Sequence, residues 1–214
     1  MPELPEVETV VRGLQNTIVG ESIMDLEVPW EKALVAEDPY ESIVGKSITG
    51  VSRRAKYIII KLDMGALLVH LRMTGKLTPI FPEKHVTVIL HFESGNSLYF
   101  QDTRKFGRMV YTDDPIETLA HIGPEPLGDQ FTPDEFYKML QGKNRLIKPL
   151  LLDQTFLAGL GNIYVDEALF QSGIQPLSIA STIPKDRASS LHSAIQSILS
   201  ASIEAQGTTV LNFS

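Results

Sequence analysis

The spacing of hydrophobic residues changes along the chain, and each change predicts a different kind of structure. The first apolar residues recur at helical intervals: Leu4, Val7, Val10, Val11, Leu14 and Ile18. This spacing predicts an amphipathic helix. Pro5, Glu6 and Glu8 suit its first turn, where proline is tolerated and the helix dipole favours negative charge. Gly20 is the predicted stop.

A second pattern follows, in which short apolar runs rich in β-branched and aromatic residues are separated by Gly, Asp, Asn or Ser. These runs predict strands over 23–28, 43–51, 57–62, 66–71, 86–92 and 97–101. Residues 63–65 and 93–96 are typical hairpin connections. Short antiparallel strands at regular intervals predict a β-sandwich.

A third pattern begins after Tyr111 and is helical. The Gly- and Pro-rich residues 123–129 predict a linker, and Thr132 followed by Pro133 is typical of a helix start. Helices are predicted over 133–141, 144–152, 162–171 and 184–206. The fold class is therefore α+β, with a helix and β-sandwich domain over 1–112, a linker over 113–131 and a helical domain over 132–214.

The charge distribution points to a polyanionic partner, although the net charge of −7 does not. Residues 51–110 hold ten Lys and Arg against four Asp and Glu, and both flanking segments are acidic. Such asymmetry is typical of a surface that faces nucleic acid, but a solvated sheet face explains it equally well. No apolar run reaches transmembrane length, and the acidic start argues against a signal peptide. We therefore expect a cytoplasmic protein with no membrane partner.

The extreme N-terminus carries candidate chemistry. Removal of Met1, which a small second residue permits, would leave Pro2 as a secondary amine. An α-amino group has a pKa of roughly 7.7–8.0, far below that of lysine, so more of it is unprotonated at neutral pH. Such an amine can attack a carbonyl carbon, with Glu3 beside it and Glu6 one turn further on. On spacing alone, an ordinary surface helix is the better interpretation.

Three basic stretches lie beside the ends of predicted strands and suit contact with phosphate. They are 53–57, 70–76 and 102–108, and the last two carry Met73 and Phe106 among basic residues. The alternatives are charged protection of an edge strand, a Met that fills the core, and a basic turn with one packed Phe. A fourth stretch, 159–164, contains Gly-x-Gly and opens a predicted helix, whose N–H groups can bind phosphate with help from Asn162.

The sequence resembles the bacterial formamidopyrimidine-DNA glycosylases, enzymes that remove oxidised purines from DNA. The resemblance rests on Pro-Glu-Leu-Pro-Glu-Val-Glu-Thr-Val over 2–10, Arg-Arg-Ala-Lys-Tyr over 53–57, His-Leu-Arg-Met-Thr-Gly over 70–75 and Asp-Thr-Arg-Lys-Phe-Gly over 102–107. Residues 159–164 resemble the family's helix–two-turn–helix motif. These motifs follow the family's order and cover essentially the whole chain.

The resemblance implies a glycosylase that is also an abasic-site lyase. Pro2 would attack C1′ of the damaged nucleoside and displace the base, and Glu3 would protonate the sugar ring oxygen. Glu6 would hold the terminus or the nucleoside, and Lys56 would reach the active site and the adjoining backbone. The resulting Schiff base would lead to β- and δ-elimination, and it needs no metal.

The resemblance also implies the DNA-binding residues. Met73 would fill the space left by the extruded base, Phe106 would wedge between base pairs, and Arg104 would contact the orphaned base. The candidate residues that contact the backbone are His70, Arg72, Lys148 and Asn162. The partner would be double-stranded DNA with oxidised bases or abasic sites, bound by a monomer in the bacterial cytoplasm and associated with the nucleoid.

The resemblance departs at the end of the chain. Family members continue past residues 207–209 into a loop over the extruded base and a four-cysteine zinc finger. This sequence stops at Ser214 and has no cysteine, so we expect no metal or cofactor in it. A fragment is the favoured interpretation over an unusual member, and lesion capture and turnover would then suffer. Two alternatives stay open: an endonuclease VIII-like enzyme for oxidised pyrimidines, and a catalytically impaired DNA-binding fragment.

Overall fold

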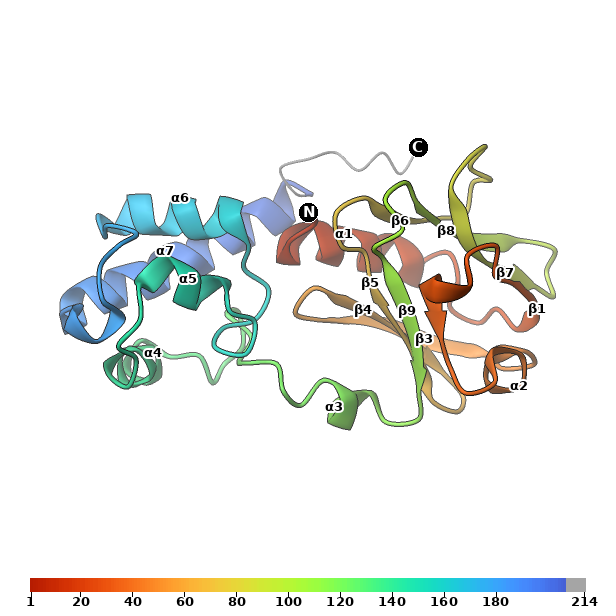
Figure 1. Ribbon diagram of the computed structural model, residues 1–214, viewed down its shortest axis with the longest axis horizontal. Coiled ribbons are helices and arrows are strands. Elements are labelled where there is room, and N and C mark those ends of the chain that lie inside the picture. Colours follow the sequence, from red (N-terminus) through yellow and green to blue (C-terminus); the bar gives the residue numbers. More distant parts are fainter. Residues whose placement is uncertain (207–214) are drawn as a thin grey trace. The chain divides into compact units, whose positions relative to one another are not determined.

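The computed structural model describes residues 1–206, and it divides into two compact units (Figure 1). The sandwich unit consists of residues 1–2 and 7–119, and the helical unit consists of residues 3–6 and 120–206. The start of the first helix is therefore grouped with the helical unit. The domain limits expected from the sequence stay a prediction.

Two β-sheets form the sandwich unit. One has the strand order β1-β7-β8-β6, and the other has the order β2-β9-β5-β4-β3. Every neighbouring pair is antiparallel except β2 and β9. The antiparallel sandwich predicted from the sequence is thus confirmed. The strands are β1 (Ile23–Glu27), β2 (Leu34–Val35), β3 (Ile48–Arg54), β4 (Tyr57–Leu62), β5 (Ala66–His70), β6 (Gly75–Thr78), β7 (Val86–Phe92), β8 (Ser97–Asp102) and β9 (Arg108–Thr112).

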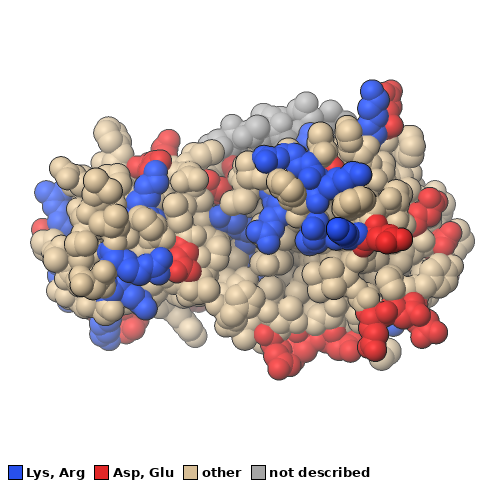
Figure 2. All heavy atoms as spheres, viewed as in Figure 1, with Lys and Arg blue, Asp and Glu red and all other residues tan. Residues whose placement is uncertain are grey.

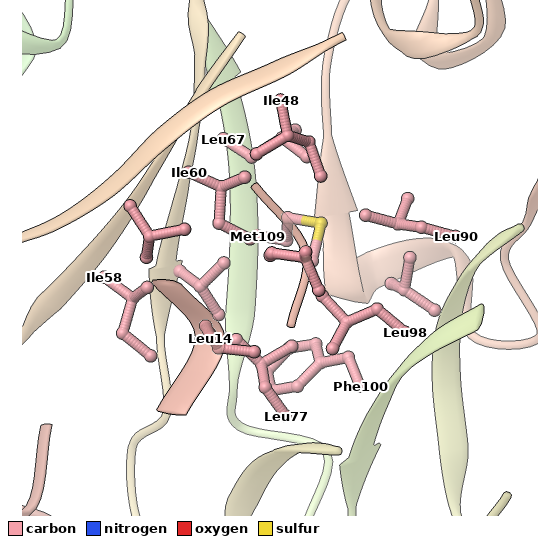
Figure 3. Close-up of a cluster of buried hydrophobic side chains, with 14 of the residues drawn as sticks. Leu14, Ile48, Ile58, Ile60, Leu67, Leu77, Leu90, Leu98, Phe100 and Met109 are labelled. Atoms are coloured by element: carbon pink, nitrogen blue, oxygen red, sulfur yellow. The ribbon is translucent and has the colours of Figure 1, made fainter. Parts of the chain in front are cut away.

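The apolar stripe of helix α1 (Leu4–Gln15) completes the core of the sandwich. Val7, Val10, Val11 and Leu14 are all at most 2% exposed. Figure 3 shows Leu14 among side chains from both sheets. Burial of such side chains contributes about 1.5–3 kcal/mol each before losses of chain entropy.

Helix α1 ends earlier than its apolar spacing predicts. The helix stops at Gln15, and turns carry the chain to Gly20, which has φ +92°. The side chains of Asn16 and Thr17 bond to the carbonyl oxygens of Arg12 and Gly13. Such side-chain bonds compete with helical ones, which accounts for the early end.

Other differences from the predicted elements also have local causes. The strand predicted over 43–51 lies at Ile48–Arg54, because Asp38 caps a short helix, α2 (Pro39–Ile43), before it. The sequence patterns do not predict strands β2, β6 and β9. Strands β2 and β6 have two and four residues, too few to establish a clear alternation, and β9 begins within the basic stretch 102–108.

The helical unit contains α4 (Pro133–Gln141), α5 (Ile147–Leu152), α6 (Asn162–Ser172) and α7 (Lys185–Glu204), and α6 and α7 lie side by side (Figure 1). Thr132 accepts the N–H of Glu135 at 3.3 Å, which confirms the predicted cap. Helix α5 starts at Ile147 rather than 144, because Leu146 forms an extended bridge with Ile179. The short elements α3 (Pro115–Thr118), η1 (Glu31–Ala33) and η2 (Ala180–Thr182) complete the structure. Within residues 1–206, no helix has the length and apolar character needed to span a membrane.

Candidate active site and nucleic-acid interface

Glu3 occupies the N-terminus of helix α6 within the helical unit. Its carboxylate accepts the backbone N–H groups of Gly161 at 2.6 Å, Ile163 at 3.0 Å and Tyr164 at 3.5 Å. Glu3 is only 3% exposed. A helix start has N–H groups without helical partners and carries a positive partial charge, so it binds an anion well. Three of the N–H groups expected to bind phosphate are therefore occupied by a carboxylate of the chain itself, and phosphate binding at Asn162 stays a prediction.

Two glycines make room for this arrangement. A Cβ atom on Gly161 would overlap the Glu3 carboxyl group and lie 2.8 Å from its Cγ atom. Gly159 has φ +84°, and a Cβ there would lie 2.5 Å from Leu4. The Gly-x-Gly pattern thus permits the close approach of residues 3 and 4.

Glu6 holds the backbone of Glu3 from the other side. One Glu6 oxygen accepts the N–H of Glu3 at 2.9 Å, and the other accepts the Tyr164 hydroxyl at 2.6 Å. A glutamate three residues into a helix that bonds back to the capping residue is half of a capping box. Glu6 is 6% exposed, so these bonds are shielded from water.

Tyr164 extends the network to the last turn of α7. Its oxygen lies 2.6 Å from Oγ of Ser202. A phenol has one proton, and here that proton goes to Glu6, so Ser202 donates to Tyr164. The hydrogen bonds therefore run in one direction, from Ser202 through Tyr164 to Glu6. Sequence reasoning assigned no role to either hydroxyl; Tyr164 lies in the Gly-x-Gly stretch, but a serine inside a helix carries no such signal.

Pro2 and Lys56 belong to the sandwich unit. Pro2 directly precedes the fixed N–H of Glu3 and is partly exposed. Lys56 is 4% exposed and follows Ala55, which has φ +53°. The Arg53 guanidinium supports this turn, because it donates to the Ala55 carbonyl at 3.0 Å and to the Glu8 carboxylate at 3.0 Å. The position of Lys56 is thus determined by an ion pair as well as by the hairpin.

Strand register brings the basic motifs to one end of the sandwich. Arg54 pairs with Tyr57, Tyr57 with His70, and His70 with Arg108. The ends of β3, β5, β4 and β9 that carry these residues therefore coincide. Figure 2 shows Lys and Arg atoms gathered over one part of the sandwich unit, with Asp and Glu atoms gathered elsewhere on it. The predicted basic surface is consistent with this segregation.

Met73 and Phe106 are displayed to solvent. Met73 is 45% exposed and Phe106 is 51% exposed. The Arg104 guanidinium lies 4.9 Å from the centre of the Phe106 ring, within the range of a cation–π contact. Neither apolar side chain serves the core, so the core-filling alternative for Met73 is excluded.

Lys148 and Asn162 lie in the helical unit. Lys148 forms an ion pair with Asp166 at 2.7 Å, which fixes it against α6 one turn from Asn162. Asn162 is the first residue of α6 and is exposed. The structure brings these two residues to one region, and their contact with DNA stays a prediction.

The environment of His70 keeps its imidazole neutral. Burial, assisted by the positive charges of Arg72 and Lys56, lowers the pKa of His70 to about 4. The N–H of Arg72 donates to Nδ1 at 3.1 Å, so the ring proton resides on Nε2. The Tyr57 ring packs edge-on at 4.8 Å. His70 can therefore donate one hydrogen bond to a phosphate oxygen without carrying charge.

This pKa predicts how stability depends on acid. Between about pH 6.5 and pH 4 the unfolded His70 binds a proton that the folded form does not, so stability falls as the pH falls. The expected loss is on the order of 2 kcal/mol at pH 4.5 relative to pH 7, after allowance for partial exposure. Urea unfolding of the parent and of His70→Gln at pH 4.5, 5.5 and 7 measures it. A substituted protein with an unchanged pH dependence would contradict the neutral imidazole.

The described residues do not fit a zinc site. The sequence contains no cysteine, and residues 1–206 contain no cluster of three or more His, Asp or Glu arranged around a common point. The four cysteines of the zinc finger that the resemblance implies have no counterpart in these 214 residues.

Comparisons with known proteins extend these observations. Residues 1–109 match the model of the formamidopyrimidine-DNA glycosylase N-terminal domain, and residues 122–214 match that of the family's H2TH domain. The glycosylase of Protochlamydia amoebophila is 43% identical over 98% of this chain and 79% of its own length. That of Herpetosiphon aurantiacus is 43% identical over all of this chain and 82% of its own length.

Solved structures agree with the sequence matches. Lactococcus lactis formamidopyrimidine-DNA glycosylase, bound non-covalently to DNA with an abasic site, aligns with a TM-score of 0.90. It is 38% identical and covers 96% of this chain and 83% of that chain. The fold and these matches define a DNA glycosylase of base-excision repair. More particularly, the chain belongs to the formamidopyrimidine-DNA glycosylase family.

Proposed function

We propose that this chain excises oxidised purines from duplex DNA and cleaves the abasic site through Pro2. The observation that carries this proposal is the double anchoring of residue 3. Its N–H is held by Glu6 and its carboxylate by the start of α6. Such preorganisation restricts where the preceding nitrogen can lie, and a fixed nucleophile reacts faster than a mobile one.

The chemistry proceeds by nucleophilic displacement. The Pro2 nitrogen attacks C1′, and the electrons of the glycosidic bond leave with the base. Glu3 passes the proton released from the nitrogen to the sugar ring oxygen, and the ring opens to an iminium ion. This cation acidifies C2′; loss of its proton expels the 3′ phosphate, and a second elimination expels the 5′ phosphate. Glu6 holds Glu3 in place, and Lys56 supplies a positive charge beside the backbone.

The exposed apolar and basic side chains bind the distorted duplex. Extrusion of a base costs a few kcal/mol, and side chains that refill the stack offset this cost. Met73 and Phe106 have the exposure that such insertion needs, and Arg104 lies on the Phe106 ring. We assign Arg104 to the orphaned base. The residues assigned to the backbone are His70, Arg72, Lys148 and Asn162. We propose that a monomer binds the duplex.

The test uses a duplex with one 8-oxoguanine. We expect excision and cleavage on both sides of the lesion, and we expect Glu3→Gln to reduce single-turnover excision by at least about 100-fold. Glu167→Gln, on the exposed face of α6, is the matched control. Faster cleavage of a thymine glycol duplex would favour the endonuclease VIII-like alternative. Tight binding without any cleavage would favour a DNA-binding protein without catalysis.

The basic end of the sandwich predicts a steep salt dependence of binding. Removal of one Lys or Arg that neutralises a phosphate should reduce the slope of log K against log salt by about 0.9. We expect Arg104→Ala and Lys56→Gln to weaken duplex binding by roughly three- to tenfold, because each removes a positive charge from the surface that faces the duplex. Lys61→Ala is the control, since Lys61 pairs with Ala66 at the other end of its hairpin. Binding that does not respond to salt would contradict this surface assignment.

A further inference from the structure

Asp102 connects two loops of the sandwich unit. It is the last residue of β8 and pairs with Gly75, the first residue of β6. We call residues 71–75 the Met73 loop and residues 103–107 the Phe106 loop. Asp102 is 1% exposed. It directly precedes the Phe106 loop and pairs with Gly75, the last residue of the Met73 loop.

The Asp102 carboxylate accepts hydrogen bonds from both loops. Oδ1 accepts the Thr74 hydroxyl of the Met73 loop and the N–H of Arg104 at 3.1 Å. Oδ2 accepts the N–H of Gly107 at 2.6 Å. The Arg104 N–H also lies 3.2 Å from the Thr74 hydroxyl oxygen. One buried group therefore fixes the position of each loop relative to the other.

Asp102 is charged when it does this. Burial favours the neutral acid, but the hydrogen bonds from Thr74 and from the N–H groups of Gly107, Arg104 and Phe106 outweigh it and hold the pKa of Asp102 below its usual value. Hydrogen bonds to a carboxylate are about twice as strong as those between neutral groups. Uncharged donors of both loops thus make charge-assisted hydrogen bonds, which are stronger than hydrogen bonds between neutral groups.

Both loops contain backbone conformations that need such support. Arg72 has φ +55° and Lys105 has φ +57°, in the left-handed region that side chains disfavour. Strained residues of this kind persist only where the surrounding structure holds them. The Phe106 loop has two further supports: the Lys105 ammonium lies 4.2 Å from the Trp30 ring centre, and Arg108 donates to the Lys105 carbonyl at 3.0 Å.

The backbone is fixed, whereas the tips of the loops are exposed. Such a surface is organised before it meets its ligand, which lowers the ordering cost of binding. We propose that Asp102 is a positioning residue that joins the Met73 and Phe106 loops, so that Met73, Arg104 and Phe106 enter a damaged duplex as one unit. The proposal rests on the DNA-binding roles proposed above for those three side chains.

The experiment separates this joining role from simple stability. Asp102→Asn replaces one acceptor oxygen with an NH₂ donor, which faces an N–H donor of the Phe106 loop whichever oxygen is replaced. Thr74→Val removes only the hydroxyl, and Thr74→Ser keeps it. The probe is a duplex with a tetrahydrofuran abasic-site analogue and 2-aminopurine opposite, whose fluorescence reports unstacking. Asp25→Asn, also in the sandwich unit, is the matched control.

We expect Asp102→Asn and Thr74→Val to weaken binding to the lesion duplex by about tenfold, the effect of losing one charged hydrogen bond. Binding to undamaged duplex should change by less than about twofold, because phosphate contacts dominate it. At saturating protein the fluorescence change should shrink, and Thr74→Ser should restore both readouts. If Asp102→Asn does not fold, the two Thr74 variants decide the question.

Phe106→Ala distinguishes the two ways in which the idea can fail. If Phe106→Ala leaves the fluorescence unchanged, the wedge role itself is wrong. A second result overturns the joining role of Asp102: Phe106→Ala abolishes the fluorescence change, whereas Thr74→Val, and Asp102→Asn if it folds, behave like the parent. Equal weakening of damaged and undamaged duplexes would also overturn it.

Discussion

Gly161→Ala is expected to reduce Schiff-base formation on abasic DNA by at least about 100-fold, the effect of a displacement of about 1 Å at a reacting group. The new Cβ would overlap the Glu3 carboxyl group and lie 2.8 Å from Glu3 Cγ. Glu3 must then leave the start of α6, and its bonds to the N–H groups of Gly161 and Ile163 are broken. Residue 2 loses its fixed neighbour as a result.

The same change should destabilise the protein by about 1–3 kcal/mol, the usual cost of overpacking. The backbone itself does not resist alanine, because Gly161 has φ −132°. Gly142→Ala is the matched control: it lies in the same unit, with no atom within 4 Å of the added carbon. Single-turnover borohydride trapping and urea unfolding on both variants measure the two effects. Parent-like trapping by folded Gly161→Ala would show that Glu3 can move without consequence for Pro2.

Much of the fold follows from short-range patterns in the sequence. The spacing of Val7, Val10 and Leu14 determines which face of α1 is buried, and Thr132 with Pro133 determines where α4 begins. Sequence patterns predict the wrong structure where a tertiary contact determines the backbone conformation. Leu146 looks helical in sequence, yet its bridge to Ile179 holds it extended, and no local feature of the chain announces that contact.

The candidate site was predictable only in part, for a related reason. The family resemblance indicated that Glu3 is a catalytic residue, and the rules of helix capping indicated that the start of α6 binds an anion. Neither indicated that the Glu3 carboxylate is itself the anion bound at the start of α6. The pairing depends on a contact between residues 158 positions apart. Ser202 is the extreme case, because its role arises only from where α7 ends relative to Tyr164.

A protein whose first residue is Pro2 should form a covalent adduct with abasic DNA in the presence of borohydride, and a protein that retains Met1 should not. In the first form the Pro2 nitrogen is a secondary amine, which attacks the aldehyde of the open-chain sugar. In the second form the nitrogen belongs to an amide, whose lone pair is delocalised into the carbonyl group. Abasic DNA needs no base to be displaced, so this assay isolates the amine chemistry from lesion recognition.

Retention of Met1 is the sharper control than a substitution, because it changes the nitrogen and leaves every side chain in place. Met1 is 49% exposed, so its presence should leave the fold and the affinity for duplex DNA within about twofold of the processed form. Pro2→Gly keeps a primary amine and can retain some trapping, so it does not separate the possibilities. Intact mass identifies the two forms, and peptide mapping of the adduct identifies the nitrogen. An adduct on Lys56 would refute the assignment of Pro2 as the nucleophile. Equal trapping by the two forms would refute it as well. If both forms bind abasic DNA and neither is trapped, the chain is a DNA-binding protein without catalysis.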